Sequence, residues 1–138
     1  MAAILSLAAG SPATSGVAWG WVRAILRLEG VAAFATAVAL YAHADFSWPL
    51  FAVLFLAPDL AMLFYLMGFR IGAGAYNVAH TYALALPLAL LGFLAGRPVV
   101  LAVALVWIAH IGLDRALGYG LKYPTRFGDT HLGSVGRR

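Results

Sequence analysis

The stretch of residues 71–96 contains no charged side chain, and residues 46–69 contain only one, Asp59. Each stretch is longer than the roughly 20 residues that cross about 30 Å of hydrocarbon. Over the whole chain only 10% of residues are charged, whereas a soluble domain carries about 25%. A chain of this composition cannot cover an apolar core with polar surface, so we expect it to fold in a lipid bilayer.

Two further apolar stretches reach spanning length when polar neighbours are included. Residues 30–44 need Leu28 and Glu29, and residues 98–113 need His110 and Asp114. The links between the four stretches are short, at residues 43–48, 68–70 and 96–98. Short links place consecutive helices antiparallel. The sequence therefore predicts an all-α fold, an antiparallel four-helix transmembrane bundle.

The basic residues indicate how this bundle is oriented. Of the nine Lys and Arg residues, only Arg97 lies on one side of the predicted bundle. The others lie on the opposite side: Arg23, Arg27, Arg70, Arg115, Lys122, Arg126, Arg137 and Arg138. Lys and Arg accumulate on the cytoplasmic side of membrane proteins, so both termini are expected in the cytoplasm. This distribution points to the lipid bilayer as the partner, and not to nucleic acid, and the short chain favours a homo-oligomer.

The chain divides into three predicted parts. Residues 1–21 form a loose N-terminal extension, which lacks the basic start of a signal peptide. Residues 22–117 form the transmembrane domain. Residues 118–138 form a cytoplasmic tail that is rich in glycine and can fold back under the bundle. The chain has no cysteine, which excludes disulfides, iron–sulfur clusters and zinc–thiolate sites.

Polar side chains recur at one depth of the predicted bundle. Counted from the cytoplasmic helix ends at about 1.5 Å per residue, Asp59 lies about 12 Å inside, Asn77 about 10 Å and His80 about 15 Å. His110 and Asp114 are four residues apart and so share one helix face. A charge at the bilayer centre costs at least about 2.5 kcal/mol, so such groups face the bundle interior and pair. The sequence therefore predicts one shared polar pocket near the cytoplasmic face.

Imidazoles together with carboxylates suit zinc, iron or manganese. We predict that four side chains ligate a divalent metal: Asp59, His80, His110 and Asp114. A second group is expected to supply a general base or a second metal site: Glu29, Asp129 and His131. Supporting positions are Tyr76, Asn77 and Trp107. Simpler interpretations stay open, since His80 can act as an interhelical hydrogen bonder and Asp59 as a protonated acid beside Pro58.

Several motifs resemble a known family. They are Arg27-Leu-Glu-Gly30, Ala57-Pro-Asp59, Tyr76-Asn-x-x-His80-Thr-Tyr82, His110-Ile-Gly-x-Asp114-Arg115, Gly118-Tyr-Gly-Leu-Lys-Tyr-Pro124 and Asp129-Thr-His-Leu-Gly133. Together they are similar to the bacterial domain of unknown function 4260, over about residues 23–136. The resemblance implies a small multi-pass protein of the bacterial inner membrane, and it implies no particular reaction.

Four functions are compatible with this pattern. The first is a metal-dependent membrane enzyme, a hydrolase or an oxidase, that acts on a lipid or amphiphile. The second is a proton- or ion-coupled transporter, because acid and imidazole chains also mark ion relays. The third is a haem protein with His80 and His110 as axial ligands. The fourth is a structural or accessory subunit whose polar layer only fixes the pairing of its helices.

Overall fold

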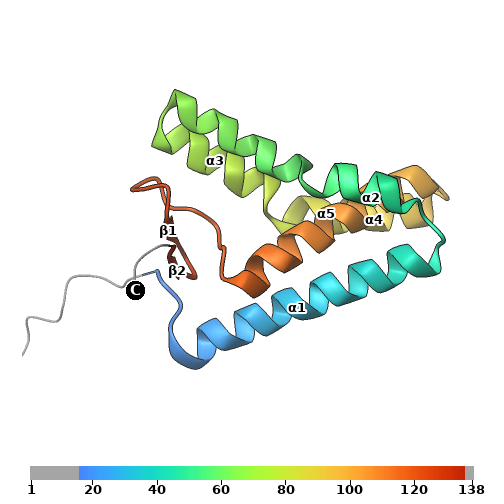
Figure 1. Ribbon diagram of the computed structural model, residues 1–138, viewed down its shortest axis with the longest axis horizontal. Helices are drawn as coiled ribbons and strands as arrows, with labels where there is room; N and C mark the ends of the chain where they lie inside the picture. Colours follow the sequence, from blue (N-terminus) through green and yellow to red (C-terminus); the bar gives the residue numbers. More distant parts are fainter. Residues whose placement is uncertain (1–15, 136–138) are drawn as a thin grey trace, which may run out of the picture.

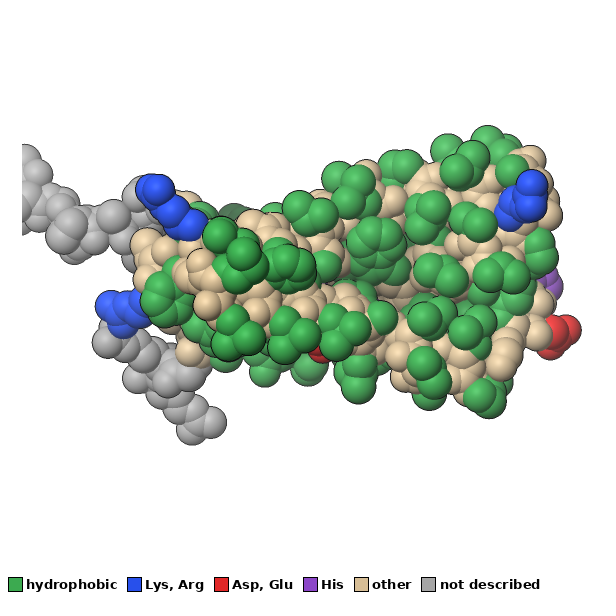
Figure 2. Space-filling model, turned by 90° about the horizontal axis from the view of Figure 1, so that it is seen from above, with side chains coloured by type: hydrophobic (Ala, Val, Ile, Leu, Met, Phe, Trp, Pro, Cys, Tyr) green, Lys and Arg blue, Asp and Glu red, His purple; other side chains and the backbone are tan. Residues whose placement is uncertain are grey.

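The computed structural model describes residues 16–135 and contains four apolar helical spans (Figure 1). They cover Gly20–His43, Trp48–Met67, Phe69–Leu94 and Pro98–Leu117. The expected four-helix bundle is therefore confirmed. Most of residues 1–21, assigned to an N-terminal extension, lie outside the described residues. Figure 2 shows a face with apolar side chains along its whole length and with Lys and Arg only at its two ends, as suits a surface in contact with lipid.

Helix α1 (Gly20–His43) packs along helix α5 (Pro98–Leu117), which is the most buried span. Two glycines bring these helices into backbone contact. A Cβ atom added at Gly30 would lie 2.7 Å from the carbonyl oxygen of Gly112, and one added at Gly112 would lie 2.6 Å from the backbone nitrogen of Phe34. Small residues allow such close approach between membrane helices. The close contact fixes α5 as the central element against which the other spans pack.

The second span changes its helical form halfway. Helix α2 (Trp48–Phe55) begins at Ser47, whose hydroxyl accepts a hydrogen bond from the backbone nitrogen of Leu50. After Leu56 the chain continues as the 3₁₀ helix η2 (Ala57–Met67). Proline has no backbone N–H and cannot donate to the residue four positions earlier, so Pro58 ends the α-helical hydrogen-bond pattern. The 3₁₀ form extends well beyond the proline, as far as Met67.

The third span is interrupted. Helix α3 (Phe69–Ala79) ends before His80, and helix α4 (Tyr82–Leu94) begins after Thr81, whose hydroxyl accepts from the backbone nitrogen of Ala83. The interruption frees carbonyl groups at the end of α3. Such groups need partners at membrane depth, and side chains of α5 supply them. The break places His80 on non-helical backbone facing α5.

The residues after α5 lie against the same end of the bundle. Gly118 ends α5 with a φ of 97°, and strands β1 (Asp129–Thr130) and β2 (Gly133–Ser134) pair antiparallel. The backbone nitrogen of Ala18 donates to the carbonyl of His131 at 2.7 Å. Figure 1 shows this segment between α3 and the start of α1. We call this end, which carries Gly20 and Leu117, the basic end, and the end near Arg97 the opposite end.

Candidate metal centre

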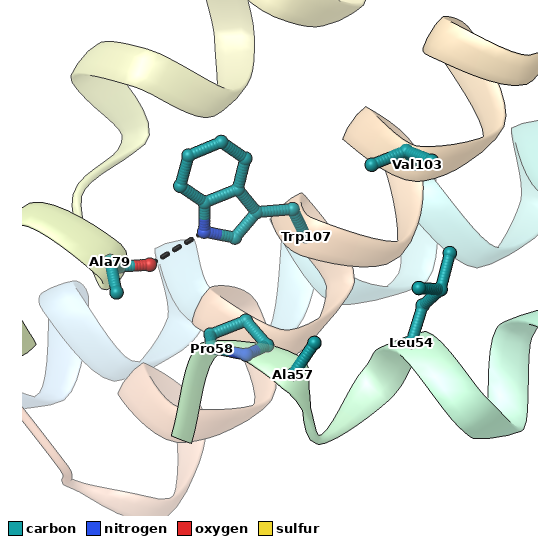
Figure 3. A pocket seen from close by; sticks show the side chains of 6 residues that line it. All are labelled: Leu54, Ala57, Pro58, Ala79, Val103 and Trp107. Atoms are coloured by element: carbon teal, nitrogen blue, oxygen red, sulfur yellow. Dashed lines mark hydrogen bonds between the residues drawn. The ribbon is translucent and has the colours of Figure 1, made fainter. Parts of the chain in front are cut away.

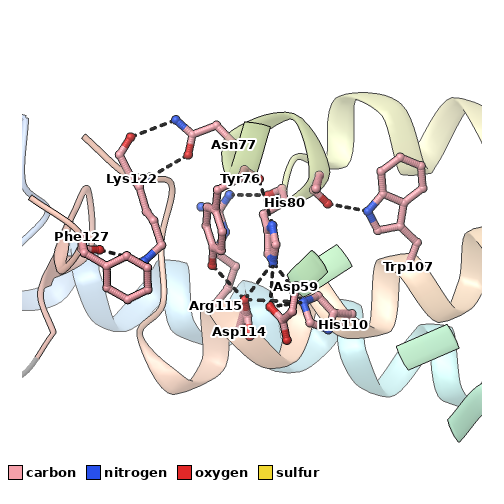
Figure 4. A network of polar contacts seen from close by, with 11 residues as sticks. Asp59, Tyr76, Asn77, His80, Trp107, His110, Asp114, Arg115, Lys122 and Phe127 are labelled. Carbon is pink, nitrogen blue, oxygen red and sulfur yellow. Dashed lines mark hydrogen bonds and ion pairs between the residues drawn. The ribbon is translucent and has the colours of Figure 1, made fainter. Parts of the chain in front are cut away.

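Four potential ligands from three spans converge near the basic end (Figure 4). Asp59 comes from η2, His80 from the break between α3 and α4, and His110 and Asp114 from α5. Each offers one ligand atom, and these atoms all lie within 4.8 Å of one another. Both histidines are buried, at 2% and 3% exposure. The two side chains that come from helix interruptions thus meet the two that share one face of α5.

Five of the six separations between the ligand atoms are close to those of a tetrahedral site, and the sixth, between the oxygens of Asp59 and Asp114, is at most 4.8 Å. The two Nε2 atoms lie 3.1 Å apart. The Nε2 atom of His80 lies 3.4 Å from Asp59 Oδ1 and 3.5 Å from Asp114 Oδ2, and that of His110 lies 3.5 Å and 3.8 Å from the same two oxygens. A tetrahedral zinc ion with bonds of about 2.0–2.1 Å has ligands about 3.3–3.4 Å apart. Slight movement of these side chains would allow all four to bind one ion.

The proton on His80 is placed by the backbone. Its Nδ1 lies 2.9 Å from the carbonyl oxygen of Tyr76, which can only accept a hydrogen bond. Nδ1 therefore carries the proton in the neutral ring, and Nε2 presents its lone pair to the cluster. Metal-binding histidines are commonly oriented in this way, with the distant nitrogen donating to a carbonyl or carboxylate.

The two Nε2 atoms are so close that a proton or a cation must lie between them. The lone pair of His80 Nε2 faces His110 Nε2, and a proton on His110 Nε2 or a cation shared by both would satisfy it. His110 Nδ1 is buried without a hydrogen-bond partner within residues 16–135. One carboxylate oxygen of Asp59 and one of Asp114 lie within 3.5 Å of His80 Nε2. A divalent cation would satisfy the lone pairs and offset the repulsion between the acids.

Tyr76 and Trp107 hold the site in place. The ring of Tyr76 stacks on His80 with centroids 3.7 Å apart, and its hydroxyl donates to Asp114 Oδ2 at 3.1 Å. The Nε1 atom of Trp107 donates to the free carbonyl of Ala79 at 2.5 Å. Tyr76 therefore orients two of the four candidate ligands, and Trp107 supports the break that positions one of them.

Asn77 joins the site to the segment below it. Its side chain accepts from the backbone nitrogen of Lys122 at 2.7 Å and donates to the carbonyl of Lys122 at 2.9 Å. The Lys122 ammonium is 3.8 Å from the ring centroid of Phe127 and donates to the Phe127 carbonyl at 2.8 Å. Burial lowers the pKa of Lys122, and the charges of Asp114 and Asp59 partly oppose this shift. Lys122 thus closes the site at the basic end.

The remaining sequence candidates lie outside the four-ligand group. Glu29 is exposed on α1. Asp129 accepts hydrogen bonds from Thr125 and Ser134. His131 Nδ1 accepts from the backbone nitrogen of Leu121 at 2.9 Å, and burial and the charge of Arg115 lower its pKa. A second metal site or a general base formed by Glu29, Asp129 and His131 stays a prediction.

A family model described as a domain of unknown function, DUF4260, matches residues 23–135. The chain belongs to this family. The match covers every candidate ligand and confirms the resemblance seen in the sequence motifs. A search of curated proteins and a search of solved structures each found no match.

Sequence reasoning did not select Arg115, although it contacts the site. Its Nη2 atom donates to the carbonyl of His80 at 3.3 Å, and its Nη1 atom lies 2.8 Å from His131 Nε2. Arg115 thus satisfies a carbonyl freed by the helix break and lies against the tail. Its position directly after Asp114 was the available signal, because a long side chain one residue away on the helix can still reach the cluster.

An apolar recess opens beside the cluster (Figure 3). Its volume is about 210 Å³. Its lining residues are Leu54, Ala57, Pro58, Ala79, Val103 and Trp107. Pro58 and Ala79 each directly precede a candidate ligand in the chain, Asp59 and His80. The recess therefore lies beside the two ligands that come from helix interruptions.

Proposed function

We propose that Asp59, His80, His110 and Asp114 bind one divalent transition metal, and that the protein is a membrane-embedded metalloenzyme that acts on a lipid or amphiphile. The observation that carries this proposal is the convergence of two imidazole nitrogens and two carboxylate oxygens at near-tetrahedral separations. Two nitrogen and two oxygen ligands without thiolate favour zinc, iron or manganese.

The chemistry of such a site depends on which metal occupies it. A divalent metal supplies Lewis acidity, which polarises a substrate oxygen or lowers the pKa of water. The chain's own residues provide orientation, since Tyr76 donates to Asp114 and Arg115 to the carbonyl of His80. Hydrolysis and oxidation both use this kind of ligand set, and the identity of the metal distinguishes them.

The exposure of the cluster supports a substrate that comes from the bilayer. The side chain of Asp59 is 35% exposed, whereas those of His80 and His110 are 3% exposed. Asp59 lies in the middle of an apolar span and follows Pro58, which lines the apolar recess. An amphiphile moving laterally in the membrane could therefore reach the metal along its Asp59 side.

Elemental analysis of the purified full chain tests the metal site. We expect a stoichiometric metal in the wild type, its loss in His80→Ala and His110→Ala, and its retention in His43→Ala, which removes an exposed histidine outside the cluster. A protein that binds no zinc, iron or manganese after reconstitution would contradict the proposal. So would metal retained in a variant that lacks both His80 and His110.

The broken third span favours a second candidate, a proton- or ion-coupled transporter. Discontinuous helices form the ion sites of many transporters, and His80 lies in such a discontinuity. Proteoliposomes provide the test. Ion or proton flux that requires His80 would favour transport, whereas lipid turnover without flux would favour the enzyme.

We further propose that the basic end faces the cytoplasm of a bacterial inner membrane. Arg97 lies at the opposite end, while Arg23, Arg27 and Lys122 lie at the basic end, and Lys and Arg accumulate on the cytoplasmic side. The chain has no native cysteine, so single cysteines report orientation directly. We expect an impermeant thiol reagent added to intact cells to label Arg97→Cys and not Ser134→Cys. The reverse pattern would invert the orientation.

A further inference from the structure

The candidate metal centre lies at the depth of lipid chains and not of lipid headgroups. Arg97 directly precedes α5, and its charge keeps this end of the helix at a boundary of the hydrocarbon. Counted from Pro98 at about 1.5 Å per residue, His110 lies about 18 Å and Asp114 about 24 Å from the opposite end. In a hydrocarbon layer about 30 Å thick, the cluster therefore lies about 6–12 Å inside the other boundary. This is the middle of the lipid chains in the leaflet at the basic end.

The cluster is open to the bilayer on the side of Asp59. The side chain of Asp59 is partly exposed, whereas the two histidines are buried. Its neighbours along the second span are strongly exposed apolar side chains, Leu56, Leu60 and Leu63. A lipid headgroup that moved to this depth would leave water without gaining equivalent hydrogen bonds, at a cost in free energy. A lipid that keeps its head at the boundary presents chain methylenes to Asp59.

The apolar recess beside the cluster lies near the bilayer midplane. Counted in the same way, Ala57 and Trp107 of its lining lie about 14 Å from the opposite end, and the midplane lies at about 15 Å. The volume of about 210 Å³ is below the range of about 300–1,000 Å³ of sites that enclose a small molecule. The indole nitrogen of Trp107 already donates to the carbonyl of Ala79. The recess thus fits the end of one hydrocarbon chain and offers nothing to a polar head.

We infer that the substrate is an acyl chain of a phospholipid in the leaflet at the basic end. The end of the chain lies in the apolar recess, and its middle lies at the metal along the Asp59 side. The inference deepens the proposed function, on which it rests for the metal, because it names the substrate class and the reacting group. The reacting group is a chain methylene and not the ester at the headgroup.

A methylene substrate selects oxidation over hydrolysis, because a methylene has no bond that water hydrolyses. In a hydroxylation, one atom of dioxygen enters a C–H bond and forms C–OH. The other atom leaves as water, with two electrons and two protons from an external reductant. Zinc has no redox chemistry, so iron or manganese is the metal expected in the site.

Trp107 itself reports what fills the recess. Trp19→Phe, Trp21→Phe and Trp48→Phe together remove every other tryptophan of the chain. This full-length variant is reconstituted in phosphatidylcholine brominated near the ester, in the middle or near the end of its chains, and bromine quenches indole fluorescence on contact. We expect the strongest quenching of Trp107 from bromine near the chain end and the weakest from bromine near the ester.

Matched variants separate the recess from the rest of the lipid-facing surface. Val103→Phe places a large side chain in the recess, whereas Val99→Phe places the same side chain at an exposed position of α5 outside it. We expect Val103→Phe to lose most of the quenching by chain-end bromine and Val99→Phe to keep it. Equal quenching in the two variants, or strongest quenching by bromine near the ester, would overturn the inference.

Manganese bound in the site identifies the part of the chain that faces the metal. The protein is loaded with Mn²⁺, which is paramagnetic, or with Zn²⁺ as the diamagnetic control, in phosphatidylcholine that carries one fluorine at each of the same three positions. We expect the largest enhancement of fluorine relaxation at the middle of the chain. The largest enhancement near the ester would overturn the inference in favour of a headgroup substrate. The largest enhancement at the chain end would overturn it in favour of a lipid from the other leaflet.

Metal content measured in the same samples distinguishes this inference from the proposed function. Val103→Phe should keep its metal, and His80→Ala should lose its metal while chain-end bromine still quenches Trp107. Quenching in a protein that binds no metal would contradict the metalloenzyme and support a chain in the recess. Metal binding without quenching of Trp107 would support the metalloenzyme and overturn the inference.

Discussion

Near the opposite end, apolar and aromatic side chains pack continuous helices, whereas near the basic end two of the four spans depart from regular α-helix. Tyr41 is fully buried among Phe46, Trp48 and Phe51. Near the basic end, η2 and the gap after α3 place Asp59 and His80 beside α5. Irregular backbone at membrane depth needs side-chain partners. One half of the bundle is therefore held together by apolar packing, and the other half is organised around polar groups.

Tyr41→Ala should give the largest effect and should affect only the packing half. Removing a fully buried aromatic side chain costs about 3 kcal/mol, and the variant also loses the 2.6 Å hydrogen bond from Tyr41 to the carbonyl of Ser47. We expect a lower free energy of unfolding in detergent with an unchanged metal content. Loss of metal in a variant that still folds would show that the two halves are coupled.

Tyr76→Phe should lower the affinity for metal and leave the stability of the protein nearly unchanged. The variant keeps the ring that stacks on His80 but loses the hydroxyl that donates to Asp114. Removing a group that orients a metal ligand typically lowers metal affinity about 10- to 100-fold. Titration with a competing chelator measures this change, and thermal unfolding of the metal-free protein should stay close to wild type. An unchanged affinity would mean that Tyr76 does not position a ligand.

Asn77→Ala should release the tail from the basic end. The variant loses both hydrogen bonds to the backbone of Lys122, at a cost of about 2 kcal/mol. We expect faster amide hydrogen exchange across residues 118–135 and little change in α4. Asn77→Asp keeps the acceptor and loses the donor, so its exchange should be intermediate. Uniform acceleration over the whole chain would instead indicate global destabilisation.

The smallest expected effect is a pH dependence of the tail. Burial and Arg115 lower the pKa of His131 below its usual 6.5, so between the lowered value and 6.5 the unfolded tail binds more protons than the folded one. Folding of the tail is therefore fully favourable above about pH 6.5 and weakens as the pH falls below it. Hydrogen exchange at residues 118–135 should show this trend in the wild type. The trend should be absent in His131→Phe, and its persistence there would assign it to another group.

The sequence predicts the four spans because their length and lack of charge leave few alternatives. It also points to Asp59, His80, His110 and Asp114, since buried polar groups in a membrane are rare and tend to pair. The break at His80 and Thr81 has no such signal, because neither glycine nor proline marks it. It depends on Arg115 and Trp107, which bind the freed carbonyls from another helix. Contacts between distant segments, such as Asn77 with Lys122, likewise depend on the assembled fold.

X-ray absorption spectroscopy of the metal-loaded protein tests the central claim most directly. We expect two imidazole nitrogens and two carboxylate oxygens at about 2.0–2.2 Å from one metal. We also expect one imidazole fewer in His110→Ala. A spectrum without imidazole scattering, or an identical spectrum for the wild type and His110→Ala, would contradict a metal bound between η2, the α3–α4 break and α5.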